Sequence, residues 1–362
     1  MSTVSATPAG PVSRIDPASA YARPAPPRRE LLRLDSNEGV LPPRDLLETL
    51  TRCDPELLRR YPDVSALEAA LAERVGVAPD SVIVTAGADE AIDRAARAFL
   101  EPGRTLLRPD PSFEMLDRYA ALAGGGLERV PWDRDAFPTE GFLKRLDARV
   151  AMLAVVSPNN PTGGVATLDD VRQLAAAAPR ALLMLDHAYV EYADRDLTPA
   201  VLDLPNVLVV RTLSKAWGLA GCRVGYAVGS PYLIAVLRAA GGPYPVAAPS
   251  VALARRQLER GGGELASHVS RIREERQLLT THLAGCGLAA RPSQANFVYV
   301  ECGRRARFIR DALAARGILV RDFPERAGLV PALRITLPGD ATAFARLTAA
   351  LTEVSLLPAA AP

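Results

Sequence analysis

The chain has 362 residues, of which 49% are hydrophobic and 23% are charged, proportions that are average for soluble globular proteins. Its 43 basic and 41 acidic residues are scattered along the sequence and leave a net charge of only +2. These values indicate neither disorder nor membrane residence, argue against nucleic acid as a partner because no basic stripe is present, and leave room for two globular domains.

The elements begin after an N-terminal arm. Residues 1–30 are rich in proline, alanine and serine and have almost no apolar periodicity, so we expect a flexible arm there. From about Leu46, short apolar runs alternate with amphipathic helical segments, a pattern typical of a mainly parallel sheet covered by helices. The predicted parallel strands are 81–85, 105–108, 151–156, 181–185, 206–210 and 224–228, and the clearest helices are 89–100 and 168–177.

The order of elements changes beyond about Pro245. A long charged helix is predicted over 264–283, then a strand at 296–300, a helix, and strands near Ile318 and Leu333. The fold class is therefore α/β, with a large α/β/α sandwich domain over 46–245 and a smaller α+β domain formed by 31–45 and 246–362. The glycine run 261–263 is predicted to be a surface turn.

Segment 211–225 lies between two predicted strands and contains the most informative residue of the chain, Lys215. A lysine at the end of a buried strand can be partly desolvated, which frees its amine to form an imine with an aldehyde. Ser214 and Arg223 beside it suit a phosphate dianion. A single lysine is more often a solvated surface charge, and only these neighbours favour catalysis.

Two turns that follow predicted strands are candidate ligand sites. Residues 85–90 lead from a strand into a helix, where the backbone N–H groups of Gly87, Ala88 and Asp89 can hold a phosphate. Residues 157–163 form a proline-rich turn in which the Asn160 amide can reach a ring hydroxyl. Taken alone, the first is also compatible with an ordinary helix start and the second with a simple turn.

Asp186 is the third candidate, because it ends a predicted strand at the edge of the sheet where ligands of open α/β sheets bind. A carboxylate at this place can keep a pyridine nitrogen protonated, and the protonated ring withdraws electrons from a carbanion. The alternative is an aspartate that caps the next helix.

In this order, the four segments resemble fold-type I aminotransferases, which use pyridoxal 5'-phosphate (PLP), over most of residues 35–336. The likeness is closest to the histidinol-phosphate aminotransferase family, a class-II group of PLP-dependent aminotransferases. Seven stretches carry it: LDSNE at 34–38, RYPD at 60–63, GADE at 87–90, AYVEY at 188–192, PYP at 243–245, VRD at 320–322 and LRIT at 333–336.

The resemblance implies a cofactor site built around Lys215, which holds PLP and later moves a proton. It implies that Asp186 pairs with the pyridine nitrogen, that Asn160 and Tyr189 face the ring hydroxyl, and that Phe113 stacks on the ring. The implied phosphate cup consists of Gly87, Ala88, Asp89, Thr212, Ser214 and Arg223, with Tyr61 reaching in from the second subunit of a homodimer.

The resemblance also implies a substrate site. Arg334 would bind the α-carboxylate of glutamate and 2-oxoglutarate through a bidentate contact. Arg321 would bind the phosphate or distal acid of the substrate. Tyr21, Tyr244 and Asn37 would complete this site. Phe113 and Tyr244 are equally compatible with core aromatics, and Arg321 with a charge at the rim.

Two residues depart from the family pattern and leave the substrate open. His187 replaces the usual glutamate after the strand aspartate, and Pro338 interrupts the Gly-Thr run that usually follows the carboxylate-binding arginine. We expect His187 to support the site indirectly. The spacing of His187, His268 and His282 predicts no metal site.

The activity implied is transamination between histidinol phosphate or imidazole-acetol phosphate and 2-oxoglutarate or glutamate, as in histidine biosynthesis. An aromatic amino acid aminotransferase and a threonine-phosphate decarboxylase share nearly all these motifs and remain alternatives. A catalytically silent regulatory domain would have lost the lysine or would carry an upstream helix-turn-helix domain, and neither is seen. A nicotinamide-dependent oxidoreductase is disfavoured because no G-x-G-x-x-G follows the first strand.

The expected location is the cytoplasm. The four cysteines, Cys53, Cys222, Cys286 and Cys302, form no C-x-x-C pair, which indicates reduced thiols. No apolar run reaches the roughly 18 residues of a spanning helix, and the N-terminus lacks the apolar stretch of a secretory signal.

Overall fold

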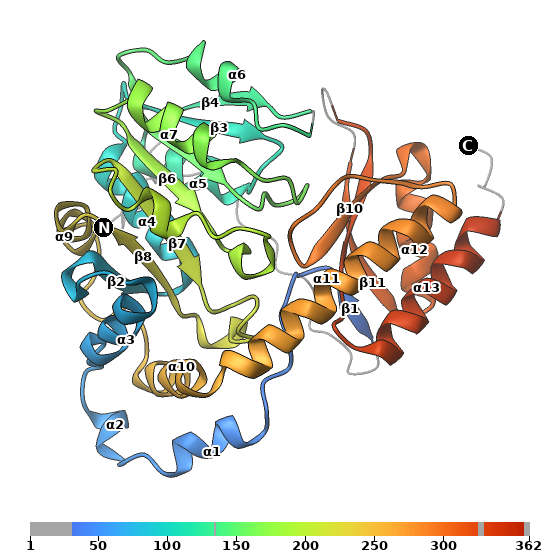
Figure 1. Cartoon of the computed structure of the whole chain (residues 1–362), viewed down its shortest axis with the longest axis horizontal. Coiled ribbons are helices and arrows are strands. Elements are labelled where there is room, and N and C mark those ends of the chain that lie inside the picture. Colours follow the sequence, from blue (N-terminus) through green and yellow to red (C-terminus); the bar gives the residue numbers. More distant parts are fainter. Residues whose placement is uncertain (1–30, 134, 325–328, 358–362) are drawn as a thin grey trace, which may run out of the picture.

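The computed structural model describes residues 31–133, 135–324 and 329–357, which form two bodies with a sheet each (Figure 1). The predicted arm and Tyr21 lie outside the described residues. The larger sheet has seven strands in the order β2-β8-β7-β6-β5-β3-β4, and the smaller has five in the order β1-β11-β12-β10-β9. The predicted α/β class with a smaller α+β part is confirmed.

The larger sheet contains every strand predicted before residue 245 and one more. Its strands are β2 (Val82–Thr85), β3 (Thr105–Asp110), β4 (Gly126–Pro131), β5 (Val150–Val156), β6 (Leu182–Asp186), β7 (Val207–Thr212) and β8 (Gly225–Gly229). The inner strands β6 and β8 are buried along their whole length, as expected for apolar runs covered on both faces. Strand β4 was not predicted, because it is a half-exposed edge strand with polar residues such as Glu128 and Arg129.

The prediction that all these strands are parallel is wrong for β8, which runs antiparallel to both β2 and β7. A parallel return requires a crossover of a dozen or more residues that is usually a helix. The connection 213–224 contains only the short 3-10 helix η4 (Ala220–Cys222), and the chain therefore reverses beside β7. This reversal leaves the Lys215 segment folded over the end of the sheet.

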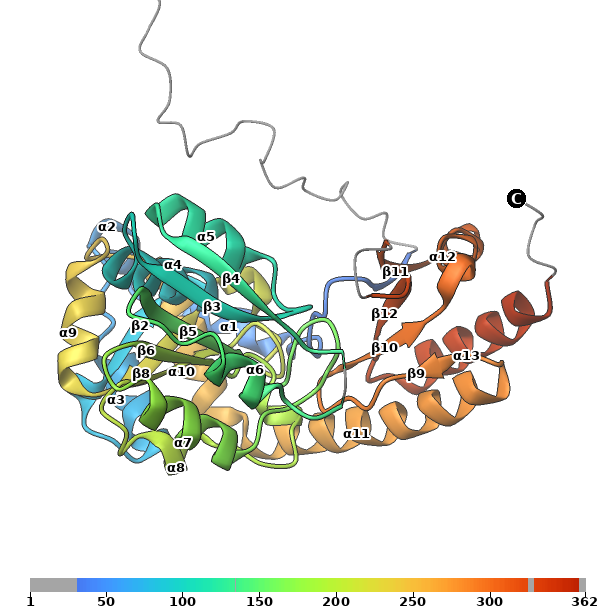
Figure 2. The same cartoon turned by 90° about the horizontal axis from the view of Figure 1, so that it is seen from above.

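Helices cover both faces of the larger sheet (Figure 2). On one face, α4 (Gly87–Phe99), α5 (Met115–Ala123) and α9 (Pro231–Ala239) share an apolar core with the sheet. On the other, the core includes α3 (Ser65–Val75), α6 (Thr139–Leu143), α7 (Leu168–Ala177) and α10 (Ala248–Arg260). The two helices predicted most clearly correspond to α4 and α7. The shorter elements are α1 (Asp45–Thr51), α2 (Glu56–Arg59), α8 (Thr198–Val201), η2 (Pro79–Ser81) and η3 (Val190–Tyr192).

The smaller body packs one side of its sheet on three helices that share one apolar core. Its elements are β1 (Leu32–Leu34), β9 (Ala289–Ala290), β10 (Phe297–Glu301), β11 (Ile318–Phe323), β12 (Ala332–Thr336), α11 (Gly262–Gly285), α12 (Ala306–Ala315), α13 (Ala341–Leu356) and η5 (Gly303–Arg305). Strand β1 pairs in parallel with β11, so residues 32–34 belong to this sheet although the rest of the sheet comes from beyond residue 288.

Helix α11 runs from the larger body to the smaller one (Figures 1 and 2). The prediction of a surface turn at the glycine run is wrong for two of the three residues, because Gly262 and Gly263 are already helical and only Gly261 forms the junction with α10. Helix α10 packs against α1, α2 and α3 on the side of the larger sheet. The predicted domain boundaries, with a large domain over 46–245 and a small domain formed by 31–45 and 246–362, stay a prediction.

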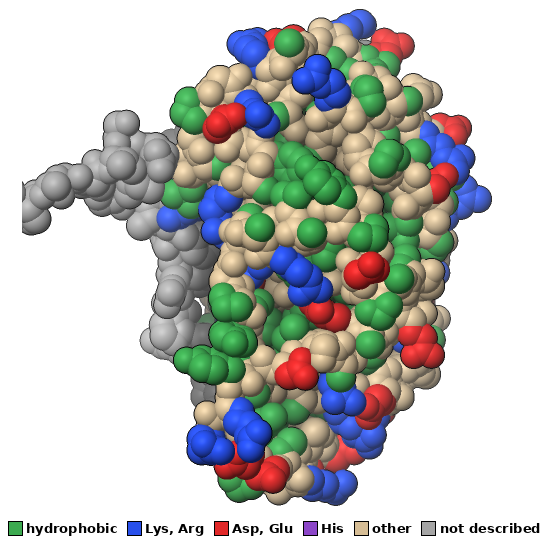
Figure 3. All heavy atoms as spheres, turned by 90° about the vertical axis from the view of Figure 1, so that its left-hand side faces the viewer, with side chains coloured by type: hydrophobic (Ala, Val, Ile, Leu, Met, Phe, Trp, Pro, Cys, Tyr) green, Lys and Arg blue, Asp and Glu red, His purple; other side chains and the backbone are tan. Residues whose placement is uncertain are grey.

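The surface facing the viewer in Figure 3 has basic and acidic side chains interspersed with apolar ones. A mixture of this kind produces no extended field of one sign over the described residues of that face. Within the described part of the chain, no helix is both long and apolar enough to cross a membrane.

Candidate active site

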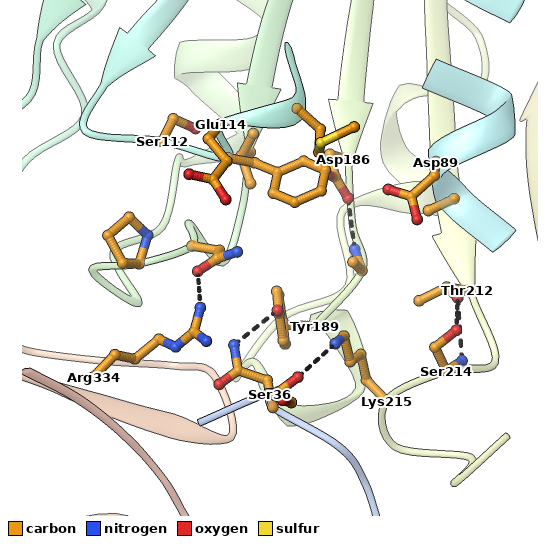
Figure 4. Close-up of a pocket in the computed structure, with 18 of the residues that line it drawn as sticks. Ser36, Asp89, Ser112, Glu114, Asp186, Tyr189, Thr212, Ser214, Lys215 and Arg334 are labelled. Carbon is orange, nitrogen blue, oxygen red and sulfur yellow. Dashed lines mark hydrogen bonds between the residues drawn. The ribbon is translucent and has the colours of Figure 1, made fainter. Parts of the chain in front are cut away.

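A cavity of about 830 Å³ lies where the two bodies meet, at the carboxyl ends of three parallel strands. Val156, Asp186 and Thr212 end β5, β6 and β7 and all line it. Figure 4 shows side chains from both bodies directed into this space. The predicted site residues that line it are Asn37, Ala88, Asp89, Phe113, Asn160, Asp186, Tyr189, Thr212, Ser214, Lys215, Arg223, Arg321 and Arg334.

Lys215 lies in the connection after β7 and extends its amine into the cavity (Figure 4). Its Nζ donates a hydrogen bond to the carbonyl of Ser36 at 3.4 Å and lies 5.5 Å from the centre of the Tyr189 ring. Gly39 packs so closely on the Lys215 carbonyl that a Cβ there would lie 1.6 Å from it. The segment after β1 therefore holds Lys215 at the carboxyl-terminal edge of the larger sheet.

Asp186 lies at the end of β6, where it is only 3% exposed. Its carboxylate accepts a hydrogen bond from the backbone N–H of Ala188 at 3.0 Å, and among the described residues it has no ion-pair partner. Burial raises the pKa of Asp186 to about 6, and the nearby charge of Asp89 acts in the same direction. A buried carboxyl of this kind is stabilised in its charged form by a cationic ring nitrogen, so the position fits the pyridine nitrogen of PLP.

The raised pKa of Asp186 predicts a pH dependence of stability in the cofactor-free protein. Because the folded-state pKa lies above the unfolded one, the contribution of this carboxyl is fully present below about pH 4 and is lost as the pH rises through about 6. Relative to Asp186→Asn, the wild type should lose up to about 3 kcal/mol of unfolding free energy over that window. Urea unfolding of both proteins from pH 4 to pH 7 measures this, and parallel pH profiles would contradict it.

A cradle for a phosphate lies at the other end of the cavity, where β8 meets the start of α4. The hydroxyl of Thr212 donates to Ser214 Oγ at 2.9 Å, and Arg223 pairs with Asp89 at 3.0 Å. A Cβ on Gly225 would lie 2.3 Å from the backbone of Gly87, so only glycine permits this approach of strand and helix. The first N–H groups of α4 and the Arg223 guanidinium converge there, and this arrangement suits a dianion.

The substrate end of the cavity is formed by residues of both bodies. Arg334 is 8% exposed, and its two terminal nitrogens donate to Asn160 Oδ1 at 2.5 Å and to the carbonyl of Asp35 at 2.6 Å. Its Nε has no partner, and burial lowers the pKa of Arg334. Asn37 donates through Nδ2 to the Tyr189 hydroxyl at 3.0 Å. Arg334 is therefore held in place with donor capacity left for a carboxylate.

Several lining residues were not predicted, among them Glu114, Arg118, Tyr119 and Phe323. For Phe323, the signal was present in the sequence, because it lies two residues after Arg321 on β11 and so shares its face of the sheet. For Glu114, the sequence offered only its place next to Phe113. The Glu114 carboxylate lies 3.9 Å from Arg321 in the structure.

The predicted tyrosines Tyr61 and Tyr244 lie outside this cavity and stack on one another, with ring centroids 4.5 Å apart and 12° between their planes. They are 80% and 52% exposed. Tyr61 also lines a second, shallower cavity of about 370 Å³ beside α10. Neither tyrosine reaches the Lys215 site of its own chain.

His187 is buried beside Asp186, and its Nδ1 lies 3.2 Å from the Thr198 hydroxyl and 3.7 Å from Asp196. Burial lowers the pKa of His187 to about 3, which keeps the imidazole neutral. These contacts anchor the loop that follows β6, and the supporting role of His187 stays a prediction. The described residues contain no group of three or more histidine, cysteine, aspartate or glutamate side chains that could hold a metal.

The other departure, Pro338, lies between β12 and α13. Gly339 after it has a φ of +65° and donates its N–H to the buried carboxylate of Glu275 at 2.8 Å. Burial raises the pKa of Glu275 to about 7. This contact fixes the turn between β12 and α13 to α11.

Comparison with known proteins gives a consistent set of matches. The sequence pattern of the family described as aminotransferase class I and II matches residues 30–351. The histidinol-phosphate aminotransferase of Thermoanaerobacter pseudethanolicus is 33% identical over 315 residues, which cover 84% of this chain and 88% of that protein. An aromatic amino acid aminotransferase of Corynebacterium jeikeium is also 33% identical, over 81% of this chain and 82% of its own length.

A solved structure agrees with these matches. The histidinol-phosphate aminotransferase of Sinorhizobium meliloti, in complex with pyridoxal 5'-phosphate, superimposes with a TM-score of 0.82 at 31% identity and covers 90% of both chains. Because the match covers 90% of this chain, it extends over both bodies.

Proposed function

Because this chain belongs to the class I and II aminotransferases and is a PLP-dependent enzyme, we propose that it exchanges an amino group between glutamate and imidazole-acetol phosphate, forming 2-oxoglutarate and histidinol phosphate. The observation that carries this proposal is a pair of arginines at the substrate end. Arg321 and Arg334 lie directly opposite one another on β11 and β12 and both line the cavity that contains Lys215. With glutamate, one arginine can bind the α-carboxylate and the other the distal carboxylate, and with histidinol phosphate, which has no carboxylate, the pair can bind the phosphate.

PLP supplies an aldehyde carbon that takes up the amino group and a ring that withdraws electrons from the substrate Cα. The side chains of this chain supply the rest. The Lys215 Nζ would take the proton from Cα and pass it to the cofactor carbon that carries the amino group, and in the opposite half-reaction it would move a proton in the reverse direction. The Asp186 carboxylate keeps the ring nitrogen protonated, and Arg334 holds the α-carboxylate so that the Cα–H bond faces the lysine. Thr212, Ser214 and Arg223 anchor the cofactor phosphate.

A second candidate is the amination of aromatic 2-oxo acids. It is supported by the Corynebacterium relative, which is as similar to this chain as the Thermoanaerobacter one. Phe113 and Phe323 line the cavity and offer apolar surface for an aromatic ring. The decarboxylation of a phosphorylated amino acid differs from both, because it requires the bond from Cα to the carboxylate to lie perpendicular to the cofactor ring. Transamination places the Cα–H bond there.

We propose that the protein works as a homodimer in the cytoplasm, with Tyr61 completing the phosphate cup of the partner subunit. The stacked Tyr61 and Tyr244 are exposed and do not line the cavity of their own chain, and exposed leucines lie in the chain segment before Tyr61. These are Leu41, Leu47 and Leu58, which are 89%, 65% and 77% exposed. Four cysteines without disulfide partners suit a reducing compartment. Sedimentation should give twice the chain mass.

The assay that tests the proposed reaction combines three readouts on one preparation of the PLP-loaded enzyme. Histidinol phosphate and phenylalanine are compared as amino donors to 2-oxoglutarate, and CO₂ release is measured with threonine phosphate. We expect kcat/KM to be highest for histidinol phosphate, because only it places a dianion near Arg321. A higher value for phenylalanine would favour the aromatic alternative, and CO₂ release without glutamate formation would contradict transamination.

A further inference from the structure

Glu114 is a charged residue inside the cavity to which the reaction described above assigns no role. It directly precedes α5, and its carboxylate is directed into the cavity (Figure 4). It caps no backbone N–H of α5, and its side chain is 64% exposed. A capping hydrogen bond therefore does not explain its presence.

Arg321 faces Glu114 across the cavity. The register of β11 and β12 places Arg321 directly opposite Arg334, on the same face of the sheet. Like charges in directly opposed positions repel one another, so an anion beside this pair stabilises it. Arg334 already contacts Asn160 and the Asp35 carbonyl, whereas the ion pair of Arg321 is with Glu114, at 3.9 Å.

A separation of 3.9 Å between Arg321 Nη2 and Glu114 Oε1 is longer than a hydrogen bond. The two side chains are 45% and 64% exposed, and exposed pairs of this kind are weak. The contact can therefore be exchanged for a better one. A phosphate or carboxylate that enters the cavity offers Arg321 a bidentate contact, which is stronger than this loose pair.

We propose that Glu114 is a specificity-determining residue: it is the resident counter-ion of Arg321 and is exchanged for the distal anion of the substrate. This inference rests on the proposed function, since it concerns how the aminotransferase site distinguishes substrates. With a neutral aromatic substrate, the Arg321–Glu114 pair stays intact and leaves no uncompensated charge. With an anionic substrate, Arg321 leaves Glu114, and the remaining carboxylate opposes the incoming anion.

Glu114 therefore weakens the preference for substrates with a distal anion and permits neutral ones. It allows one cavity to accept glutamate as well as a neutral aromatic amino acid, the substrate of the second candidate function. Removal of the charge should raise kcat/KM for histidinol phosphate by about threefold to tenfold, and less for glutamate, whose distal group has a smaller charge. The value for phenylalanine should not rise.

The experiment is a double-mutant cycle on the PLP-loaded enzyme with Glu114→Gln, Arg321→Gln and the double variant. For each, kcat/KM is measured with histidinol phosphate, glutamate and phenylalanine. Glu140→Gln is the matched control, because Glu140 lies on α6 outside the cavity and its side chain is 87% exposed. A second readout, which does not depend on turnover, is the dissociation constant of inorganic phosphate for the PLP-loaded enzyme. It should be lower for Glu114→Gln than for the wild type.

The expected result is a higher ratio of histidinol phosphate to phenylalanine in Glu114→Gln, a smaller gain when Arg321 is already glutamine, and no change in Glu140→Gln. The gain should shrink at high salt, because exposed charges are screened. An unchanged ratio, or an equal gain without Arg321, would overturn the proposal. If histidinol phosphate is not a substrate, the proposed function fails. In that case, kcat/KM for glutamate and phenylalanine and the binding of inorganic phosphate still decide the role of Glu114.

Discussion

Replacement of Lys215 by alanine should abolish transamination and remove the visible absorption band of the lysine-bound cofactor. A positioned general base alone is typically worth roughly 10² to 10⁴ in rate. Lys215→Ala should lose more than that, because the same amine both binds the cofactor covalently and moves the proton. The measurements are steady-state kcat with glutamate and 2-oxo acid, and the visible spectrum of the purified variant.

The chain offers a matched control for this experiment, since Lys144 and Lys215 are its two lysines. Lys144 is exposed on the surface next to α6 and pairs with Glu140, so Lys144→Ala should keep both the band and the activity. Borohydride reduction followed by peptide mapping should label the peptide that contains Lys215. Substantial turnover of Lys215→Ala without added amine would contradict this assignment.

Replacement of Arg334 by glutamine should lower kcat/KM for glutamate on the order of 10² to 10³, mainly through a higher KM. The reason is geometric, because Asn160 and the Asp35 carbonyl hold the guanidinium in a buried position from which a carboxylate can be gripped at two points. Glutamine keeps an amide donor but loses the charge. Kinetics with glutamate and with 2-oxoglutarate measure the effect on both half-reactions.

Arg291→Gln is the control for the loss of an arginine from the smaller body. Arg291 pairs with Glu301 and packs on the Tyr299 ring, and it does not line the cavity. Its replacement should leave KM for glutamate unchanged. Equal kinetic losses in both variants would show that Arg334 acts through the stability of the smaller sheet and not through the substrate.

The sequence was most informative where burial is complete. Strands β5, β6 and β7 are covered on both faces, so their apolar runs stand out in the sequence. The edge strand β4 was not predicted, because solvent on its exposed side permits polar residues. The antiparallel direction of β8 was also not predicted, because it depends on how residues 213–224 turn and not on the apolar pattern of the strand itself.

The residues of the candidate site could be predicted to different degrees, depending on how local their signal in the sequence is. Asp186 ends a buried strand and Lys215 follows one, and together with the residues around Lys215 these positions suggested chemistry. Arg334 is far along the chain from both, so only the family resemblance connected it with them, and the structure places it in the same cavity. Glu114 had no signal, because its importance comes from Arg321 on another body, and no local pattern records that proximity.

The most direct test of the central assignment is the visible spectrum of the purified, PLP-loaded protein before and after the addition of glutamate, with Lys215→Ala measured in parallel. The wild type should show the band of the lysine-bound cofactor, and glutamate should collapse it as the amino group is transferred. The variant should lack the band from the start. A wild-type protein that shows no such band and releases no PLP on denaturation would contradict the account.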